Sequence, residues 1–294
     1  MATPASAEPP ALIPRQTLFS NPDRASVQLG PDGQRISYLA PLHGVLNVWV
    51  GPADSPQSAR PVTRDQGRGI RFYGWTYTNS HIAYIQDMDG DENWHLYVVD
   101  LASGNIGDLT PIEGVQARIQ ETSPRFPEEL LIGLNGRNPQ FHDIYRINLL
   151  TGKRDLVQQN DGFAGFLTDE NFNIRFALRL TSDGGSEMLR PTETGHWESF
   201  IKVGMEDTLT TSPIGFNRTS NVMYLVDSRG RNTAALTSLN LDTGELTLIA
   251  EGDRADVSDT MVHPTEKTLQ AVAFTYLRKQ WQTLCVLWLT ATLR

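Results

Sequence analysis

The chain repeats a short strand-like pattern about every 47 residues along its whole length. Six runs share it, each with apolar or small residues at alternate positions: residues 36–39, 82–85, 131–134, 176–178, 222–225 and 272–274. Such alternation is typical of a β-strand with one buried face. Repeats of roughly 40 to 50 residues that each hold several strands are typical of the blades of a β-propeller. This spacing restricts the fold more than any other feature.

A second pattern recurs with the same spacing. It begins with Asp or Asn and closes with Ser or Thr followed by Gly, at residues 100–104, 148–152 and 240–244. Each copy follows a run of alternating residues, so it predicts a tight turn between two strands. Glycine supplies the positive φ of such a turn, and the polar side chains bond its backbone. Two further turns, residues 31–33 and 263–265, precede the first and the last strand-like run.

The two patterns together predict four antiparallel strands per repeat. The expected fold is therefore all-β: a β-propeller of six recognisable four-stranded blades. A β-sandwich also has closely spaced strands, but it does not predict two turn patterns that both recur after about 47 residues. No long amphipathic helix is expected. We expect a flexible segment at residues 1–14, the propeller at 15–284 and an apolar segment of uncertain origin at 285–294.

Net charge and cysteine content limit the kinds of partner and the cellular compartment that we expect for this chain. The 294 residues have a net charge of −9. Phosphate backbones and anionic lipids repel such a chain, so we expect neither nucleic acid nor a membrane as partner. A single cysteine, Cys285, excludes an intramolecular disulfide and fits a reducing compartment. Without a signal-peptide pattern in residues 1–10 or a span-length apolar run, we expect a cytoplasmic location.

No motif predicts catalysis, a metal or a cofactor. The Gly-x-Ser-x-Gly nucleophile elbow is absent. The most similar segment, residues 184–188, belongs to a polar turn. The six histidines stand singly, without the spacing of a zinc site. We therefore name no catalytic residue, no metal ligand and no cofactor. Whether the chain is an enzyme stays open at this point.

The densest charged segment contains five candidate site residues: Asp87, Asp89, Asp91, Glu92 and Asn93. It is not an EF-hand loop, because the sixth and twelfth positions hold Glu92 and Val98 where Gly and Glu are required. The segment falls between the expected second and third strands of its blade. One interpretation is a polar turn held by the packing of the tryptophan that follows it.

The other interpretation of this segment is functional. Successive turns of an antiparallel blade emerge at opposite ends, so this turn shares an end with the connections between blades. Those connections contain Glu206, Asp207 and Arg254. Acidic groups that converge there would bind a peptide ammonium group or a docked domain. The sequence leaves both interpretations open.

Four segments of the chain carry a family resemblance: residues 84–94, residues 133–138 with 143–145, residues 227–235, and residues 263–265 with 271–274. In this order and spacing they resemble the prolyl oligopeptidase family of serine peptidases, in particular its bacterial dipeptidyl-aminopeptidase and acylaminoacyl-peptidase type. The resemblance covers about residues 12–284. It implies a propeller, usually of seven blades, that covers an α/β-hydrolase domain carrying the Ser, Asp and His. Because the chain ends at Arg294, we expect it to be truncated before that domain.

The resemblance implies a substrate-gating propeller that is inactive alone. Its partners in the parent enzyme would be the α/β-hydrolase domain and short peptides. The alternative is a stand-alone protein-interaction propeller. A WD-repeat form is disfavoured because no tryptophan is followed by Asp, and a Tol-type form requires an export signal. A sialidase-like glycosidase requires Ser-x-Asp-x-Gly boxes, which the sequence lacks.

Overall fold

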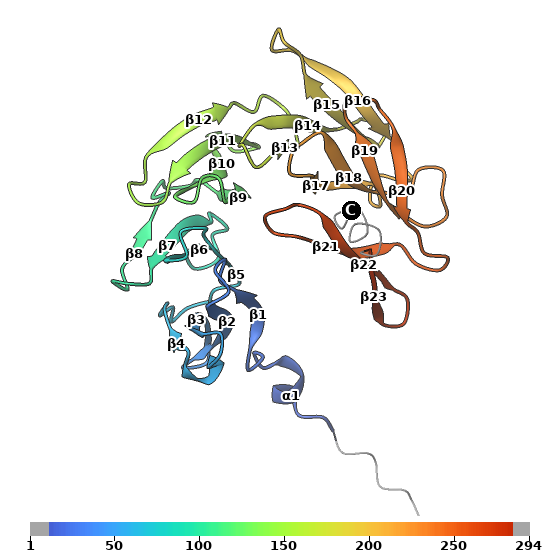
Figure 1. Ribbon diagram of the computed structural model, residues 1–294. Helices are drawn as coiled ribbons and strands as arrows, with labels where there is room; N and C mark the ends of the chain where they lie inside the picture. Colours follow the sequence, from blue (N-terminus) through green and yellow to red (C-terminus); the bar gives the residue numbers. More distant parts are fainter. Residues whose placement is uncertain (1–11, 285–294) are drawn as a thin grey trace, which may run out of the picture. The chain divides into compact units, whose positions relative to one another are not determined.

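The computed structural model describes residues 12–284, in which β-strands dominate (Figure 1). Helix is limited in this part of the chain to α1 (Arg15–Phe19) and a 3-10 turn at Pro56–Ser58. The expectation of no long helix is therefore confirmed for residues 12–284. The predicted apolar segment 285–294 lies outside the described residues, as do residues 1–11 of the predicted flexible segment.

The chain divides into two compact units, the first up to Pro111 and the second from Ile112. The first unit contains two antiparallel sheets in which neighbours in sequence are neighbours in space. One sheet is β1 (Ala25–Leu29), β2 (Arg35–Leu42), β3 (Val45–Pro52) and β4 (Arg60–Pro61). The other is β5 (Phe72–Trp75), β6 (His81–Gln86), β7 (His95–Asp100) and β8 (Ile106–Asp108).

The second unit contains four sheets with the same simple order. The first two comprise β9 (Ala117–Thr122), β10 (Glu129–Asn138), β11 (Phe141–Asn148) and β12 (Arg154–Gln158), then β13 (Gly165–Thr168), β14 (Ile174–Leu180), β15 (Ser186–Pro191) and β16 (Trp197–Val203). The last two comprise β17 (Ser212–Phe216), β18 (Val222–Asp227), β19 (Ala235–Asn240) and β20 (Leu246–Ala250), then β21 (Val257–Val262), β22 (Leu269–Thr275) and β23 (Lys279–Thr283).

Each of the six repeated sequence runs forms the second strand of its sheet, namely β2, β6, β10, β14, β18 and β22. A second strand has a hydrogen-bonded neighbour on both sides, and each of these six strands contains buried apolar residues. Leu131 and Ile132 in β10, for example, have no exposed surface. Five sheets have four strands, and the sixth has three within the described residues. These sheets are the blades of a β-propeller, which confirms the predicted fold.

The recurring Asn/Asp turns join the third strand of a blade to the fourth, as predicted. In the turn after β11, the side-chain oxygen of Asn148 accepts hydrogen bonds from the backbone N–H groups of Leu150 (3.1 Å) and Thr151 (2.9 Å). The N–H of Gly152 donates to the carbonyl of Asn148 over 2.9 Å, with φ of +68°. Glycine adopts this conformation without steric cost, which explains its place in the pattern.

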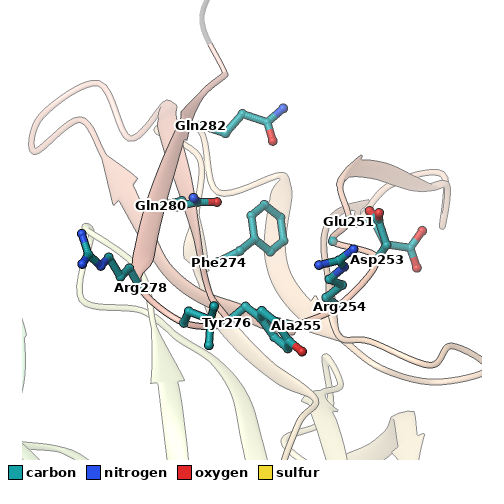
Figure 2. A pocket seen from close by; sticks show the side chains of 11 residues that line it. Glu251, Asp253, Arg254, Ala255, Phe274, Tyr276, Arg278, Gln280 and Gln282 are labelled. Atoms are coloured by element: carbon teal, nitrogen blue, oxygen red, sulfur yellow. The ribbon is translucent and has the colours of Figure 1, made fainter.

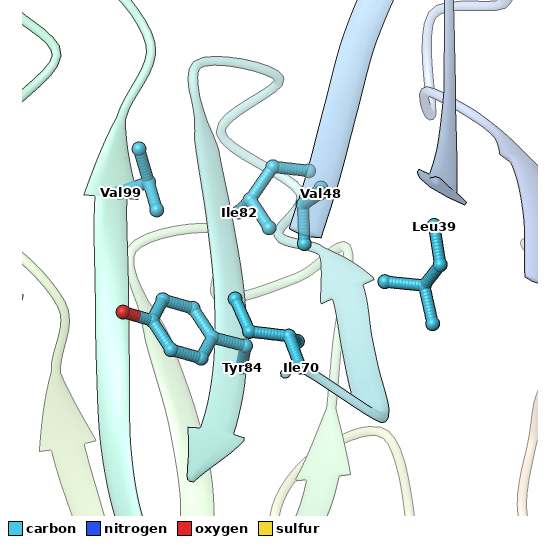
Figure 3. Packing of buried hydrophobic residues seen from close by; sticks show 6 residues of the cluster. All are labelled: Leu39, Val48, Ile70, Ile82, Tyr84 and Val99. Atoms are coloured by element: carbon cyan, nitrogen blue, oxygen red, sulfur yellow. The ribbon is translucent and has the colours of Figure 1, made fainter. Parts of the chain in front are cut away.

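In the first unit, the core lies between the two sheets (Figure 3). Val48 from β3 packs with Ile82 from β6 and Val99 from β7, and none of these side chains has exposed surface. Burying one such side chain contributes roughly 1.5–3 kcal/mol to folding. Leu39, Ile70 and Tyr84 complete the cluster.

Candidate functional site

The acidic segment predicted as a site forms the loop between β6 and β7. Its first residue, Asp87, is held by an ion pair: Nη1 of Arg68 donates to Oδ2 of Asp87 over 2.7 Å. Only 4% of the Asp87 side chain is exposed. Arg68 lies in the connection between β4 and β5, so this pair joins the loop to the chain that links the two sheets. Asp87 therefore has a structural partner.

Asp91 shapes the same loop from within. Its Oδ1 accepts the backbone N–H groups of Met88 (3.2 Å) and Asn93 (3.0 Å), and its Oδ2 accepts the Asn93 side-chain amide at 3.1 Å. These bonds, led by that from the Asn93 side chain, lower the pKa of Asp91 below its usual value. Asp91 and Asn93 therefore act together to hold the turn.

Asp89 and Glu92 are exposed and lie on left-handed backbone, with φ of +54° and +61°. Residues other than glycine adopt this conformation uncommonly, and such positions are enriched at functional sites. After the loop, Trp94 packs edge-on against Phe72, with ring centroids 6.5 Å apart. Asp89 and Glu92 are therefore the members of the predicted set with the best access to a ligand or a docked domain.

In the second unit, the predicted residues Glu206, Asp207 and Arg254 lie in connections between sheets. Asp207 accepts the hydroxyl of Ser228 over 2.7 Å and so stabilises its own connection. Glu206 is exposed. We use the name connection end for the end of the second unit that carries these connections and the turns between second and third strands. The opposite end, which carries the other turns of each sheet, is the turn end.

A hollow of about 590 Å³ opens at the connection end, between the β20–β21 connection and the β22–β23 turn. Figure 2 shows Phe274, Gln280 and Arg254 around it. The Arg254 guanidinium lies over the ring of Tyr276, 5.8 Å from its centroid. The lining combines exposed aromatic and charged groups, a composition that suits a protein or peptide surface.

The connection end also carries the most exposed apolar side chains of the second unit. Among the described residues of the second unit, the five most exposed large apolar side chains all lie there: Leu180 (69%), Met205 (67%), Leu209 (96%), Tyr276 (64%) and Leu277 (89%). At the turn end the most exposed is Leu150, at 55%. Sequence reasoning missed these residues, although an apolar residue in an otherwise polar loop, such as Leu209, was the available signal.

Residues 184–188, the nearest sequence to a nucleophile elbow, cover the β14–β15 turn and the start of β15, so no strand-to-helix bend exposes Ser186. Within residues 12–284, no three His, Cys, Asp or Glu side chains are grouped so as to hold a metal ion. In the same part of the chain, no helix has the length and apolar character needed to cross a membrane.

Two curated proteins align with almost the whole chain. Dipeptidyl aminopeptidase BIII of Pseudoxanthomonas mexicana is 45% identical over 272 residues, which cover 92% of this chain and 40% of that protein. Dipeptidyl peptidase family member 6 of Caenorhabditis elegans is 31% identical over 282 residues, covering 90% and 38%. The chain thus spans about two fifths of the curated relatives it matches. No family model matches the chain.

Solved structures agree on the fold. A prolyl endopeptidase superposes with a TM-score of 0.64 at 13% identity, over 89% of this chain and 41% of that one. The β-propeller domain of the trilobed protease from Pyrococcus furiosus gives 0.54 at 14% identity, over 90% and 82%. Dipeptidyl peptidase 4 of Porphyromonas gingivalis gives 0.53 at 12% identity, over 86% and 42%. The chain is therefore a homologue of the N-terminal part of dipeptidyl peptidases, and it shares the β-propeller fold of these solved structures.

Proposed function

We propose that this propeller covers an α/β-hydrolase domain and limits the access of substrates to short peptides. The proposal is supported by relatives that are named as dipeptidyl peptidases and are more than twice as long as the aligned segment. The peptidase chemistry would belong to the hydrolase domain, and no catalytic residue is assigned to this chain.

The observation that carries the proposal is the difference between the two ends of the second unit. Exposed apolar side chains that gather on one face mark interaction surfaces, because water leaves them when a partner docks. Leu209, Met205 and Leu277 are exposed at the connection end. The recurring turns at the turn end instead carry Asn, Asp, Ser or Thr with Gly. A hydrolase domain docked on the connection end would cover the apolar side chains.

Acidic residues at such connections would help to select the substrate. Asp89 and Glu92 in the first unit, and Glu206 in the second, are exposed carboxylates in loops of this kind. A carboxylate forms a charge-assisted hydrogen bond with the free ammonium group of a peptide. We propose that Asp89 and Glu92, which lie in one loop of the first unit, recognise the peptide N-terminus or a basic patch of the hydrolase domain.

A chimera tests the docking. Residues 12–284 replace the aligned N-terminal part of dipeptidyl aminopeptidase BIII, and turnover of chromogenic dipeptides is compared with that of long peptides. We expect turnover of the short substrates only. Leu209→Asp should weaken docking and admit long peptides, whereas Leu150→Asp, the same change at the turn end, should not. Equal behaviour of the two variants would contradict the proposal.

The isolated chain should hydrolyse none of these substrates. Turnover that a serine-directed inhibitor abolishes would show a catalytic site within this chain. That result would contradict the proposal that the peptidase chemistry belongs to the hydrolase domain. The alternative, a stand-alone interaction propeller, predicts that both leucine variants leave the chimera's size limit unchanged.

The single cysteine and the net charge of −9 support a cytoplasmic location without nucleic-acid or membrane partners, which cell fractionation would test.

A further inference from the structure

A second cavity, of about 190 Å³, lies at the turn end of the second unit. Residues from all four sheets of the unit line it: Glu121 lies near the end of β9, Thr168 ends β13, Tyr224 lies in β18, and Lys267 lies in the β21–β22 turn. Phe216 at the end of β17 adds an aromatic wall. The cavity is distinct from the hollow at the connection end, and the proposed docking does not use it.

One carboxylate of this cavity is buried and lacks a hydrogen bond. Glu170 is 9% exposed, and its Oε1 accepts no hydrogen bond from the described residues. Nζ of Lys267 lies 3.2 Å from this atom, within ion-pair distance but outside hydrogen-bond geometry. On the other side of the carboxylate, Nε of Arg125 is 3.8 Å from Oε2. Oε1 therefore retains the capacity to accept a hydrogen bond from a donor in the cavity.

The second carboxylate, that of Glu121, accepts its two hydrogen bonds from neutral groups. Oε1 of Glu121 accepts the backbone N–H of Thr122 at 3.2 Å, and Oε2 accepts the hydroxyl of Thr168 at 3.3 Å. No Lys, Arg or His nitrogen of residues 12–284 comes within 4.0 Å of Glu121. Burial raises the pKa of Glu121, and the charge of Lys267 acts against this rise. A cation beside Glu121 would relieve the cost of its buried charge.

The third acidic residue of the lining is already satisfied. Asp169 pairs with Arg175 over 3.1 Å, and its Oδ1 accepts the backbone N–H groups of Asn171 and Asn173. Binding capacity therefore rests on Glu121 and Glu170. Lys267 is the one ammonium group among the lining residues.

We propose that this cavity binds a primary ammonium group on an alkyl stem, held between the carboxylates of Glu121 and Glu170. The volume exceeds the roughly 30 Å³ that one water takes in the liquid, so it accommodates carbon as well as the charged head. Phe216 and Tyr224 offer aromatic surface to the stem and the cation. Lys267 is an internal competitor for the same carboxylates. That the ammonium belongs to a peptide rests on the proposed function; the binding itself does not.

Calorimetric titration of the full chain tests the site with matched probes. Nα-acetyl-lysine amide carries the ammonium on a stem, Nα-acetyl-norleucine amide is its neutral counterpart, and glycinamide represents a peptide N-terminus. We expect the lysine probe to bind and the norleucine probe not to bind. Weaker binding of glycinamide than of the lysine probe would assign the site to a side chain, as the proposed stem predicts.

Variants assign the binding to the carboxylates. Glu121→Gln should weaken binding of the lysine probe about tenfold or more, the scale of one charge-assisted hydrogen bond. Lys267→Met removes the competitor and should tighten binding. Glu245→Gln, at an exposed turn of the same unit, is the control and should change nothing. Thermal unfolding of each variant verifies that it is folded.

Equal binding of the lysine and norleucine probes would overturn the proposal, as would wild-type affinity in Glu121→Gln. Loss of binding in a folded Lys267→Met variant would also overturn it, because that result makes Lys267 a support of the site instead of a competitor. These measurements use the chain without a hydrolase domain. Failure of the gating proposal would therefore leave them unaffected, and their failure would leave the gating proposal intact, because that proposal does not use this cavity.

Discussion

His142 in β11 links the stability of the second unit to pH. Burial, as the larger cause, and the charge of Arg118 lower its pKa from 6.5 to about 4, although Asp143 acts in the opposite direction. Its Nε2 is buried without a hydrogen-bond partner among the described residues. The opposite strand leaves little room for adjustment, because a Cβ placed on Gly133 would come within 3.0 Å of the His142 Cβ. The ring is therefore held in an environment that favours its neutral form.

The first prediction concerns this residue. The unfolded chain binds a proton at His142 near pH 6.5, whereas the folded chain resists protonation until about pH 4. The contribution of His142 to stability is thus complete above pH 6.5 and is lost as the pH falls toward 4. His142→Phe should flatten the pH dependence of the unfolding free energy across this interval. Urea denaturation at several pH values measures it, with the exposed His196→Asn as control. A slope equal to wild type would contradict this assignment.

At the level of single residues, the sequence predicted the position of the acidic loop but not the contacts of its side chains. The acidic loop was recognisable because its charges are closely spaced, and the structure places that loop between β6 and β7 as expected. The roles of the individual residues in this loop could not be predicted, because Asp87 pairs with Arg68, which lies in a different connection. The cavity residues Glu121, Glu170 and Lys267 come from three different blades, so no local pattern brings them together.

At the level of elements, the predictable strands are those with a buried face. Second strands such as β10 and β18 alternate or run apolar because they lie inside their sheets. Fourth strands are poorly marked: β12 is exposed at four of its five positions, and β4 is only Arg60–Pro61. An edge strand that is exposed needs no apolar alternation, so its sequence carries little signal. The turns were predictable because their chemistry is local.

The second prediction tests such a turn. Asn148→Ala removes the oxygen that accepts three hydrogen bonds, from the backbone N–H groups of Leu150 and Thr151 and from the Thr151 hydroxyl. We expect a loss of about 1 kcal/mol of unfolding free energy, measured by urea denaturation. Asp242→Ala, in the equivalent turn after β19, is the control and should cost less than about 0.5 kcal/mol. Equal losses would mean that the side-chain bonds of Asn148 do not stabilise its turn.

At the level of the whole molecule, the chain forms two compact units that divide between Pro111 and Ile112. The repeated sequence pattern does not reveal this division, because it continues through both units with the same spacing. Segments between compact units open with less loss of packing than segments inside a blade, and proteases cut where the chain opens.

The third prediction follows from this boundary. A protease that cleaves after Glu should first cut the native chain at the exposed Glu113, beside Gly114 in the connection from β8 to β9. Mass spectrometry of an early time point identifies the fragments, which should end at residue 113 and begin at 114. Glu113→Gln should abolish the early cut. First cleavage within a sheet of either unit would contradict the expected order.

The exposed apolar side chains at the connection end of the second unit also constrain self-association. Surfaces that pair through the same patch on both copies are related by a two-fold axis, so each copy uses its patch once and the pair is closed. Among the described residues of the second unit, the most exposed apolar side chain at the turn end is Leu150, at 55%, against 96% for Leu209. Contact between two copies through Leu209 and Leu277 would therefore form a closed pair and hide both residues from a third copy.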